Sequence, residues 1–354
     1  MNYENILKKE FTSHTFQINL KMELGNVFGS YENDDNLIIG KEIFLFTNPN
    51  IIRIYDCITL KKNNQFELPI TPIKYEIVNN NHILIYNKHI LYCYPMDFSS
   101  NKLLFKFFVP DIFLFKYLKE RKEILIQLKK DQTFNRINLE GIIEFCSSSN
   151  LKVYFNLNEI DKEEKNIMED DYLGDAYLPS SYYRNIHGFD KDKYFLKFFG
   201  YCLSSGDPYD DYSEEYYNIT IYNSDNMDEI YSNDIIDCLG CKKLTDNLFT
   251  GIDGNEPIFY YNETEKKIIF LKDILNGKYF SLNSENKIAV FVKPNIIYLI
   301  DFEKEIKRCV MLKESYDDYN VLKIGYYCDK GKEYLFLIIN NVQYQRQIIK
   351  GQIL

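Results

Sequence analysis

The clearest pattern of apolar and polar positions lies at Lys287–Asp301, with the sequence KIAVFVKPNIIYLID. An apolar run from Ile288 to Val292 is followed by the polar segment Lys293-Pro294-Asn295, and a second apolar run ends at Asp301. Two short runs rich in β-branched and aromatic residues around a Pro/Asn turn predict a β-hairpin. Proline has no backbone N–H to donate to a strand ladder, so it fits the connection between the strands.

The same hairpin pattern recurs along the chain. The hairpin runs end, in chain order, at Asp56, Pro95, Asn138, Asn223, Asn262, Asp301 and Ile348. Three of the intervals between these positions are 39 residues long: 56 to 95, 223 to 262 and 262 to 301. A hairpin repeated at about 40 residues is the period of one blade in a β-propeller, where each blade has four antiparallel strands.

One interval is much longer than the others. It spans 85 residues, from Asn138 to Asn223, and holds either a blade with long insertions or an eighth unit. The acidic stretch between Glu159 and Asp175 has the composition of a loop, which favours seven blades. The predicted fold is therefore all-β, a propeller of seven four-stranded antiparallel blades. It is predicted to be a single domain over residues 1–354, with acidic, Tyr-rich insertions at about 158–183 and 201–217.

The N-terminus predicts how the ring is closed. Residues 1–12 form a short lead-in that is either helical or disordered. From Thr15 to Leu20 polar and apolar residues alternate, and Phe16, Ile18 and Leu20 share one face. Because this strand has no hairpin partner, we expect it to complete the last blade by pairing with C-terminal strands. Such pairing removes an exposed sheet edge.

Composition narrows the class of protein. The aromatic fraction is 16%, all Tyr and Phe with no Trp, which favours strands. No run of 18 apolar residues is present, so no membrane span is predicted, and the first residues do not have the pattern of a secretory signal. Several of the eight cysteines lie in or beside apolar strand runs (Cys57, Cys93, Cys146 and Cys309), where they act as small core hydrophobes. These features predict a cytoplasmic protein.

The acidic charge is concentrated in two segments that we expect to be loops. Residues 159–175 carry a net charge of −6 and residues 207–217 one of −5, against −10 for the whole chain. Tyrosines are interleaved with these acids, and tyrosine is a frequent binding hot spot because it buries a large rigid area. The carboxylates would steer a basic partner to this surface. The candidate partner-binding residues are Asp170, Asp171, Tyr172, Asp207, Tyr209, Asp210, Asp211, Tyr212, Glu214, Glu215 and Tyr216. The alternative is that both loops are solvated and contact nothing.

The sequence does not have the patterns of nucleic-acid, metal, phosphate or catalytic sites. Nucleic acid is disfavoured because phosphate needs Lys and Arg clusters. The acids between Asp207 and Glu214 do not have the spacing of an EF-hand. The pair Cys238 and Cys241 lacks a second pair to complete a zinc site, and Gly325–Lys332 lacks the spacing of a phosphate loop. The four histidines form no catalytic or metal-binding spacing. We therefore predict no catalytic residue, metal or cofactor.

Two strand ends resemble a known family. Ile54-Tyr55-Asp56 and Leu299-Ile300-Asp301 resemble the end of the third strand of WD40 repeats, where Trp-Asp is usual, and Leu248–Asn262 is similar to that family's strand, Asp-Gly turn and strand. The chain departs from the family in having no Trp and no Gly-His pair before a hairpin. The resemblance implies a degenerate WD40-like propeller acting as a rigid scaffold.

Together these observations predict a non-enzymatic protein–protein interaction scaffold. Its acidic, Tyr-rich loops would be presented to a basic protein or peptide. The alternative is an enzyme or small-ligand binder that uses the central funnel of the propeller.

Overall fold

The structure is a computed structural model, and it describes a defined part of the chain. The described residues are 3–25, 37–39, 42–48, 50–68, 74–78, 82–87, 90–95, 103–108, 112–128, 134–138, 153–156, 178–204, 213–234, 241–251, 258–271, 275–282, 286–292, 295–316, 321–340 and 346–354. Within them lie one short helix, α1 (Tyr3–Lys8), and 28 strands. The prediction of an all-β protein is confirmed.

The chain divides into two compact units. Unit 1 comprises Met1–Thr71 with Lys242–Leu354, and unit 2 comprises Pro72–Cys241. Both are built from meanders, meaning antiparallel groups in which each strand pairs with the next along the chain. Within the described residues, the sheets contain seven such meanders. The expectation of a single domain over residues 1–354 stays a prediction.

Unit 2 holds the second, third and fourth meanders. The second is β6 (Lys74–Val78), β7 (His82–Asn87), β8 (Ile90–Pro95) and β9 (Phe105–Phe108). The third is β10 (Ile112–Leu118), β11 (Glu123–Leu128) and β12 (Phe134–Asn138). The fourth is β14 (Leu178–Phe189), β15 (Tyr194–Ser204), β16 (Ser213–Asn223) and β17 (Glu229–Asp234). The remaining strand, β13 (Val153–Asn156), pairs in parallel with β9 and adds a fifth strand to that sheet.

Unit 1 holds the other four meanders. The first is β2 (Leu37–Ile39), β3 (Glu42–Asn48), β4 (Ile51–Asp56) and β5 (Lys62–Glu67). The fifth is β18 (Cys241–Thr245), β19 (Leu248–Gly251), β20 (Ile258–Asn262) and β21 (Lys267–Leu271). The first residue of β18, Cys241, is the last residue of unit 2. The sixth is β22 (Lys278–Ser281), β23 (Lys287–Val292), β24 (Ile296–Asp301) and β25 (Ile306–Met311). The seventh is β26 (Val321–Asp329), β27 (Lys332–Asn340) and β28 (Arg346–Ile353), completed by β1 (Thr12–Gly25).

The predicted hairpins are confirmed as antiparallel neighbours, from β3–β4 near the N-terminus to β27–β28 at the C-terminus. The described part of the 85-residue interval contains β13 and the long strands β14 to β16. Four strands were expected in each blade. The third meander has three strands within the described residues, so this expectation is not met there.

The residues that end the hairpins have a shared structural role. Asp56, Asn223, Asn262 and Asp301 each accept a hydrogen bond from a backbone N–H two or three residues later, at 2.6 to 3.2 Å. The fourth residue after each of them has a positive φ of 50–63°. Asp and Asn suit this position because their short side chains can close a turn on their own backbone. The repeated closing residue is thus the cap of a repeated turn.

Meanders of the same unit pack against each other. Phe291 of the sixth meander and Leu337 of the seventh belong to one core cluster, and Ile43 of the first shares a cluster with Phe336 of the seventh. In unit 2 the cluster containing Leu84 and Phe115 joins the second meander to the third. Strands between two neighbours are covered on both faces, which explains their continuous apolar runs.

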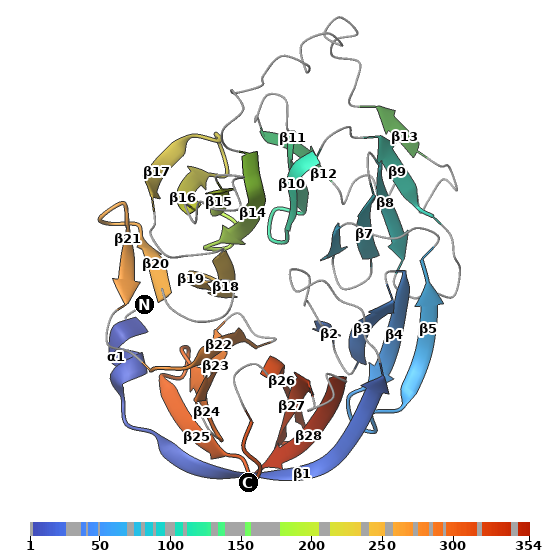
Figure 1. The fold of residues 1–354 in the computed structure, drawn as a ribbon, viewed down its shortest axis with the longest axis vertical. Helices are drawn as coiled ribbons and strands as arrows, with labels where there is room; N and C mark the ends of the chain where they lie inside the picture. Colours follow the sequence, from blue (N-terminus) through green and yellow to red (C-terminus); the bar gives the residue numbers. More distant parts are fainter. Residues whose placement is uncertain are drawn as a thin grey trace, which may run out of the picture. The chain divides into compact units, whose positions relative to one another are not determined.

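The N-terminal strand completes the seventh meander, as predicted. Residues Thr12 to Thr15 of β1 pair in parallel with β25, and residues from Phe16 to Gly25 pair antiparallel with β28. Figure 1 shows β1 (blue) running past β25 and then β28. One strand thus joins the sixth and seventh meanders into an eight-stranded sheet, and it is longer than the predicted Thr15–Leu20.

The lead-in before β1 forms α1, so the helical alternative for residues 1–12 is the correct one. Tyr3, Ile6 and Leu7 are buried in a cluster with residues of the fifth and sixth meanders. The ammonium of Lys307, a buried residue of β25, donates to the Leu7 carbonyl at 2.9 Å. Burial lowers the pKa of Lys307. The N-terminal 23 described residues therefore contact three consecutive meanders.

Candidate functional site

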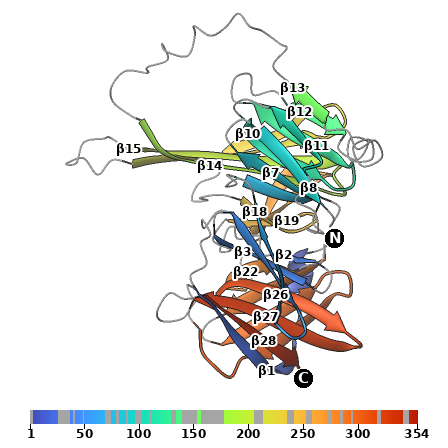
Figure 2. The same ribbon diagram turned by 90° about the vertical axis from the view of Figure 1, so that its right-hand side faces the viewer.

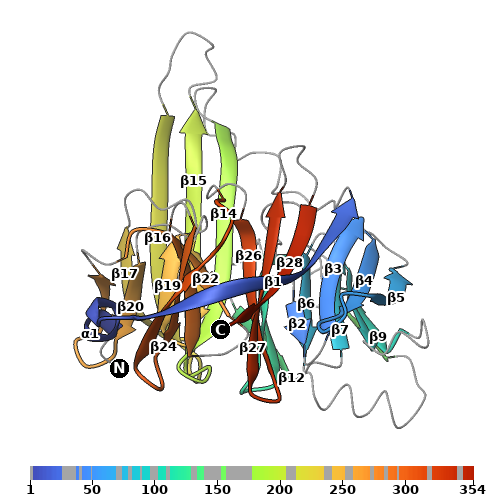
Figure 3. The same ribbon diagram turned by 90° about the horizontal axis from the view of Figure 1, so that it is seen from below.

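The fourth meander contains the longest strands of unit 2. β14 has 12 residues, and β15 and β16 have 11 each, whereas the other described strands of this unit have four to seven. Figures 2 and 3 show β14, β15 and β16 extending past the ends of the other strands of unit 2. At about 3.3 Å per residue, these strands are roughly 35 Å long. We call the three strands the ribbon.

The base of the ribbon is packed against the third meander. Phe195 of β15 stacks on Tyr222 of β16 with ring centroids 4.9 Å apart. The ring of Phe134 from β12 meets both in edge contacts, at 4.9 and 5.1 Å. Aromatic pairs of this kind add to the free energy gained by burying their area.

Polar contacts fix the same junction. The backbone N–H of Glu120 donates to buried Asp192 at 2.7 Å. Arg121 pairs with Asp225 at 2.8 Å, and Arg136 donates to the Ser224 carbonyl at 2.7 Å. The ribbon therefore begins on a rigid base.

Three tyrosines lie in one row across the ribbon. Tyr182 of β14 is opposite Tyr201 of β15, and Tyr201 is opposite Tyr216 of β16. Residues directly opposite each other on neighbouring strands belong to the same face of a sheet. The next residue of β16, Tyr217, is on the other face, which is buried there: Tyr217 is 2% exposed and its ring lies 6.0 Å from that of Phe198.

Most of the predicted partner-binding residues fall outside the described residues. These are Asp170, Asp171, Tyr172, Asp207, Tyr209, Asp210, Asp211 and Tyr212. The other three lie on β16, where Glu214 is opposite Leu203, Glu215 is opposite Cys202, and Tyr216 is in the tyrosine row.

The expectation of a loop is wrong for residues 213–217 of the second acidic segment, whereas residues 159–175 lie outside the described residues. Residues 178–183, 201–204 and 213–217 are strand. The charges and tyrosines of these segments suggested loops. The largely apolar segment from Tyr194 to Leu203, however, is a signal for a strand. In addition, Glu214 and Glu215 are opposite uncharged residues of β15, so no like charges face each other between these strands.

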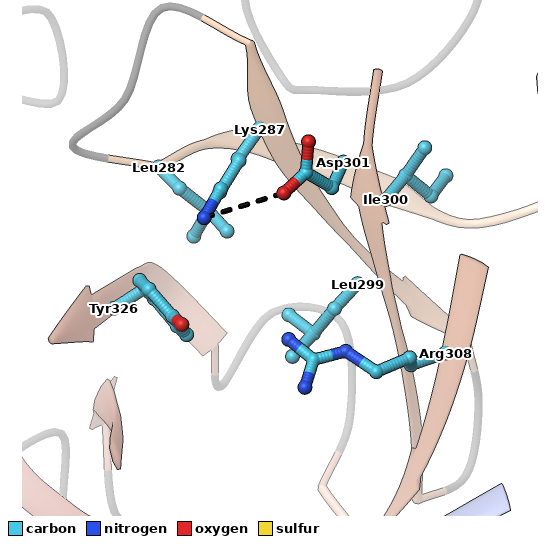
Figure 4. A pocket seen from close by; sticks show the side chains of 7 residues that line it. All are labelled: Leu282, Lys287, Leu299, Ile300, Asp301, Arg308 and Tyr326. Atoms are coloured by element: carbon cyan, nitrogen blue, oxygen red, sulfur yellow. Dashed lines mark ion pairs between the residues drawn. The ribbon is translucent and has the colours of Figure 1, made fainter. Parts of the chain in front are cut away.

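A second site lies between the sixth and seventh meanders of unit 1. A hollow with an empty volume of about 230 Å³, open solvent included, lies there, and Figure 4 shows the side chains that line it. Its lining residues are Leu282, Lys287, Leu299, Ile300, Asp301, Arg308 and Tyr326. Its enclosed part is about 10 Å³, which is room for about one water molecule.

Ionic contacts hold the cavity wall. The Lys287 ammonium lies 3.3 Å from the Asp301 carboxylate and 5.1 Å from the centroid of the Tyr326 ring. Arg308 makes a bidentate contact with Glu333, in which Nη2 donates to Oε1 at 3.0 Å and Nη1 donates to Oε2. The Tyr326 hydroxyl also donates to Glu333. Sequence patterns did not reveal this group because it forms only when two meanders pack.

The charges of this group are set by its contacts. The hydrogen bonds from Arg308 lower the pKa of the Glu333 carboxyl. Burial, followed by the hydrogen bond to Glu333, raises the pKa of Tyr326. Glu333 is therefore ionised and Tyr326 protonated at neutral pH.

The described part of the chain offers little other candidate chemistry. There, no group of three or more His, Cys, Asp or Glu side chains is placed to hold a metal ion. Among the described helices, none has the length and apolar character needed to cross a membrane. Cys57, Cys93 and Cys309 are buried, as predicted, and Cys146 lies outside the described residues.

Comparisons with known proteins concern the fold alone. No protein-family model matches the chain, and no curated protein matches its sequence. The β-propeller domain of Cps50 (Swd1) from Myceliophteria thermophila is 8% identical, with 95% of this chain and 99% of that one covered and a TM-score of 0.48. BBS1N, crystallised in complex with ARL6DN, is 10% identical, with 96% and 98% covered and a TM-score of 0.49. No residue role is taken from either structure.

Proposed function

We propose that this protein is a seven-bladed β-propeller that acts as a non-enzymatic scaffold for protein–protein interaction. The seven meanders, each antiparallel and taken in chain order, support the propeller. The pairing of β1 with β28 supports closure of its last blade. A propeller holds its connecting segments on a rigid frame, which lowers the entropy cost of binding a partner.

The ribbon is the proposed docking site. The observation that carries this proposal is the backbone register, which sets Tyr182 opposite Tyr201 and Tyr201 opposite Tyr216. Tyrosines in a row offer a partner a continuous area with polar edges, which is typical of binding hot spots. Glu214 and Glu215 adjoin the row, and the other candidate acids lie in the two segments that enter β14 and β16.

The proposed partner is a basic protein or peptide in the cytoplasm. The acids at 159–175 and 207–217 account for the negative charge of the whole chain, so the attraction would be local to this surface. Attraction of this kind raises the rate of association and weakens as salt is added. Nucleic acid is not proposed, because the same charges repel phosphate.

The test measures the affinity of a partner purified from native extract at low and high salt. Changing the five acids Asp207, Asp210, Asp211, Glu214 and Glu215 to their amides is expected to weaken binding by about tenfold or more and to flatten its salt dependence. A matched control changes five exposed acids elsewhere, Glu10, Glu67, Glu229, Glu263 and Glu303, to their amides. Both sets raise the net charge equally, so only a local effect separates them.

Tyr201 provides the second arm of this test because it is the middle residue of the row. Tyr201→Ala is expected to weaken binding by about 30-fold, the size of a hot-spot loss, and Tyr201→Phe by much less. If the ribbon and control acid sets weaken binding equally, or if Tyr201→Ala leaves affinity unchanged, the ribbon is not the docking site.

A further inference from the structure

The bend that leads into β22 contains the only Asn-Gly pair in the sequence, Asn276-Gly277. Both residues lie outside the strands, between the end of β21 and the start of β22 at Lys278. The Asn276 side chain is exposed to solvent. Asparagine is a thermolabile residue because its amide can be lost, and an exposed amide in an irregular segment is open to that reaction.

Packing requires a glycine at position 277. A Cβ atom placed there would lie 2.5 Å from the Phe291 carbonyl oxygen and 3.0 Å from Cγ1 of Val290 and Cγ2 of Val292. A backbone carbonyl in the middle of a packed sheet cannot give way as the tip of a flexible side chain can, so a larger residue does not fit. The contact between this bend and β23 therefore dictates which residue follows Asn276.

The residue before Asn276 is held as well. Tyr279 is 0% exposed, and its hydroxyl donates to the Leu275 carbonyl at 2.6 Å. Asn276 thus lies between two fixed points, the Leu275 carbonyl and Gly277. An atom added to the main chain between them must displace one of the two contacts.

We propose that Asn276 is a site of spontaneous deamidation and isoaspartate formation. The backbone nitrogen of Gly277 gives up its proton and attacks Cγ of Asn276, and the side-chain NH₂ group leaves with a proton as ammonia. The product is a five-membered succinimide ring, which water opens at either of its two carbonyls. Glycine favours the attack because it has no side chain to shield its nitrogen or to restrict its backbone.

The two products of ring opening have different consequences. Opening at one carbonyl gives aspartate, which adds a charge at an exposed position and leaves the main chain unchanged. Opening at the other gives isoaspartate, in which the main chain runs through Cβ and is one carbon atom longer between the two fixed points. That extra length displaces the start of β22, where the Lys278 ammonium donates to the Val321 carbonyl of the seventh meander at 3.3 Å.

Incubation of the full chain at alkaline pH, followed by peptide mapping with mass spectrometry, measures the reaction. Asn276 is expected to lose its amide at least about tenfold faster than Asn226, an exposed asparagine that precedes Met227, which corresponds to a barrier lower by about 1.4 kcal/mol. A protein isoaspartyl methyltransferase labels the isoaspartate. Asn276→Gln is expected to remove that label from the mapped peptide, because glutamine would have to form a six-membered ring.

The free peptide Leu-Asn-Gly-Lys gives the rate without the fold. The folded chain is expected to react up to about tenfold more slowly than this peptide, because ring closure moves Gly277 away from Phe291. The proposal is overturned if Asn226 reacts as fast as Asn276, or if the folded chain reacts more than about a hundredfold more slowly than the peptide.

Pulse proteolysis separates the effects of the two products. The denaturant concentration is chosen so that the Asn276→Asp variant stays folded, and the aged chain then receives a brief protease treatment. Molecules that carry isoaspartate are expected to be digested preferentially, with an unfolding equilibrium constant about tenfold higher than that of the variant. Digestion of isoaspartate-bearing and unmodified molecules in equal proportion would overturn the placement of Asn276 between two fixed points.

Discussion

Gly351→Ala is expected to lower the free energy of unfolding by about 3 kcal/mol, the largest single effect that the structure predicts. A Cβ atom on Gly351 would lie 2.3 Å from Cζ of Phe16 and 2.7 Å from the Gln17 carbonyl oxygen. Phe16 is 1% exposed and belongs to the core shared by the sixth and seventh meanders. The added methyl group would displace this ring and with it the N-terminal strand. Chemical denaturation of the purified protein measures the loss.

Gly331→Ala is the matched control for this prediction. Gly331 has φ of +78°, and a Cβ atom placed there would meet nothing within 4 Å. Its substitution should cost only the backbone strain, about 1 kcal/mol. In a Phe16→Ala background the effect of Gly351→Ala should shrink, because most of the clash is gone. Equal losses for the two glycine variants would contradict the observed packing of β1 on β28.

Arg308→Met is expected to cost about 1–3 kcal/mol at pH 7, because it leaves the partly buried Glu333 carboxylate without its partner. The side chains of Arg308 and Glu333 are 22% and 27% exposed, so solvent screens part of the loss. The variant should still fold, since methionine fills a similar volume. Denaturation curves at pH 7 and at about pH 3.5 measure the effect and its pH dependence.

The sign of that pH dependence follows from Glu333. Arg308 lowers the pKa of its carboxyl below the ordinary value of 4.5. A lowered pKa adds stability that is present above 4.5 and is lost as the pH falls through the folded value. The difference between wild type and Arg308→Met should therefore shrink at acidic pH. If the difference in unfolding free energy between wild type and Arg308→Met is the same at both pH values, the pairing with Arg308 does not stabilise the ionised form of Glu333.

Local patterns along the chain predicted most of the strands. The hairpins were predictable because an apolar run, a turn and a second apolar run are adjacent in sequence, as at Lys287–Asp301. The repeated end residues were visible for the same reason, since Asp56 and Asn262 cap turns within their own next three residues. The pairing of β1 followed from a single strand that had no neighbour of its own.

Contacts between distant segments were not predictable in this way. Arg308 and Glu333 meet because two meanders pack, and nothing in either strand marks its partner. Lys307 appears in sequence as one more charged residue of a strand, yet it is buried and its ammonium donates to the Leu7 carbonyl of α1. The tyrosine row depends on the register of three long strands, and a shift of one residue would place Tyr201 on the other face.

In this fold the N-terminal strand closes the seventh meander in the observed register. The most direct measurement is disulfide formation in the double variant Gln17→Cys/Gln352→Cys under mild oxidation. Residues directly opposite each other, as these two are, have Cα atoms about 4.5–5.5 Å apart, within disulfide reach. In the control Gln17→Cys/Gln347→Cys, residue 347 lies opposite Glu23, roughly 20 Å along the strand. A crosslink in the first pair only is the predicted result, and a crosslink in neither pair or in the control would contradict the closure.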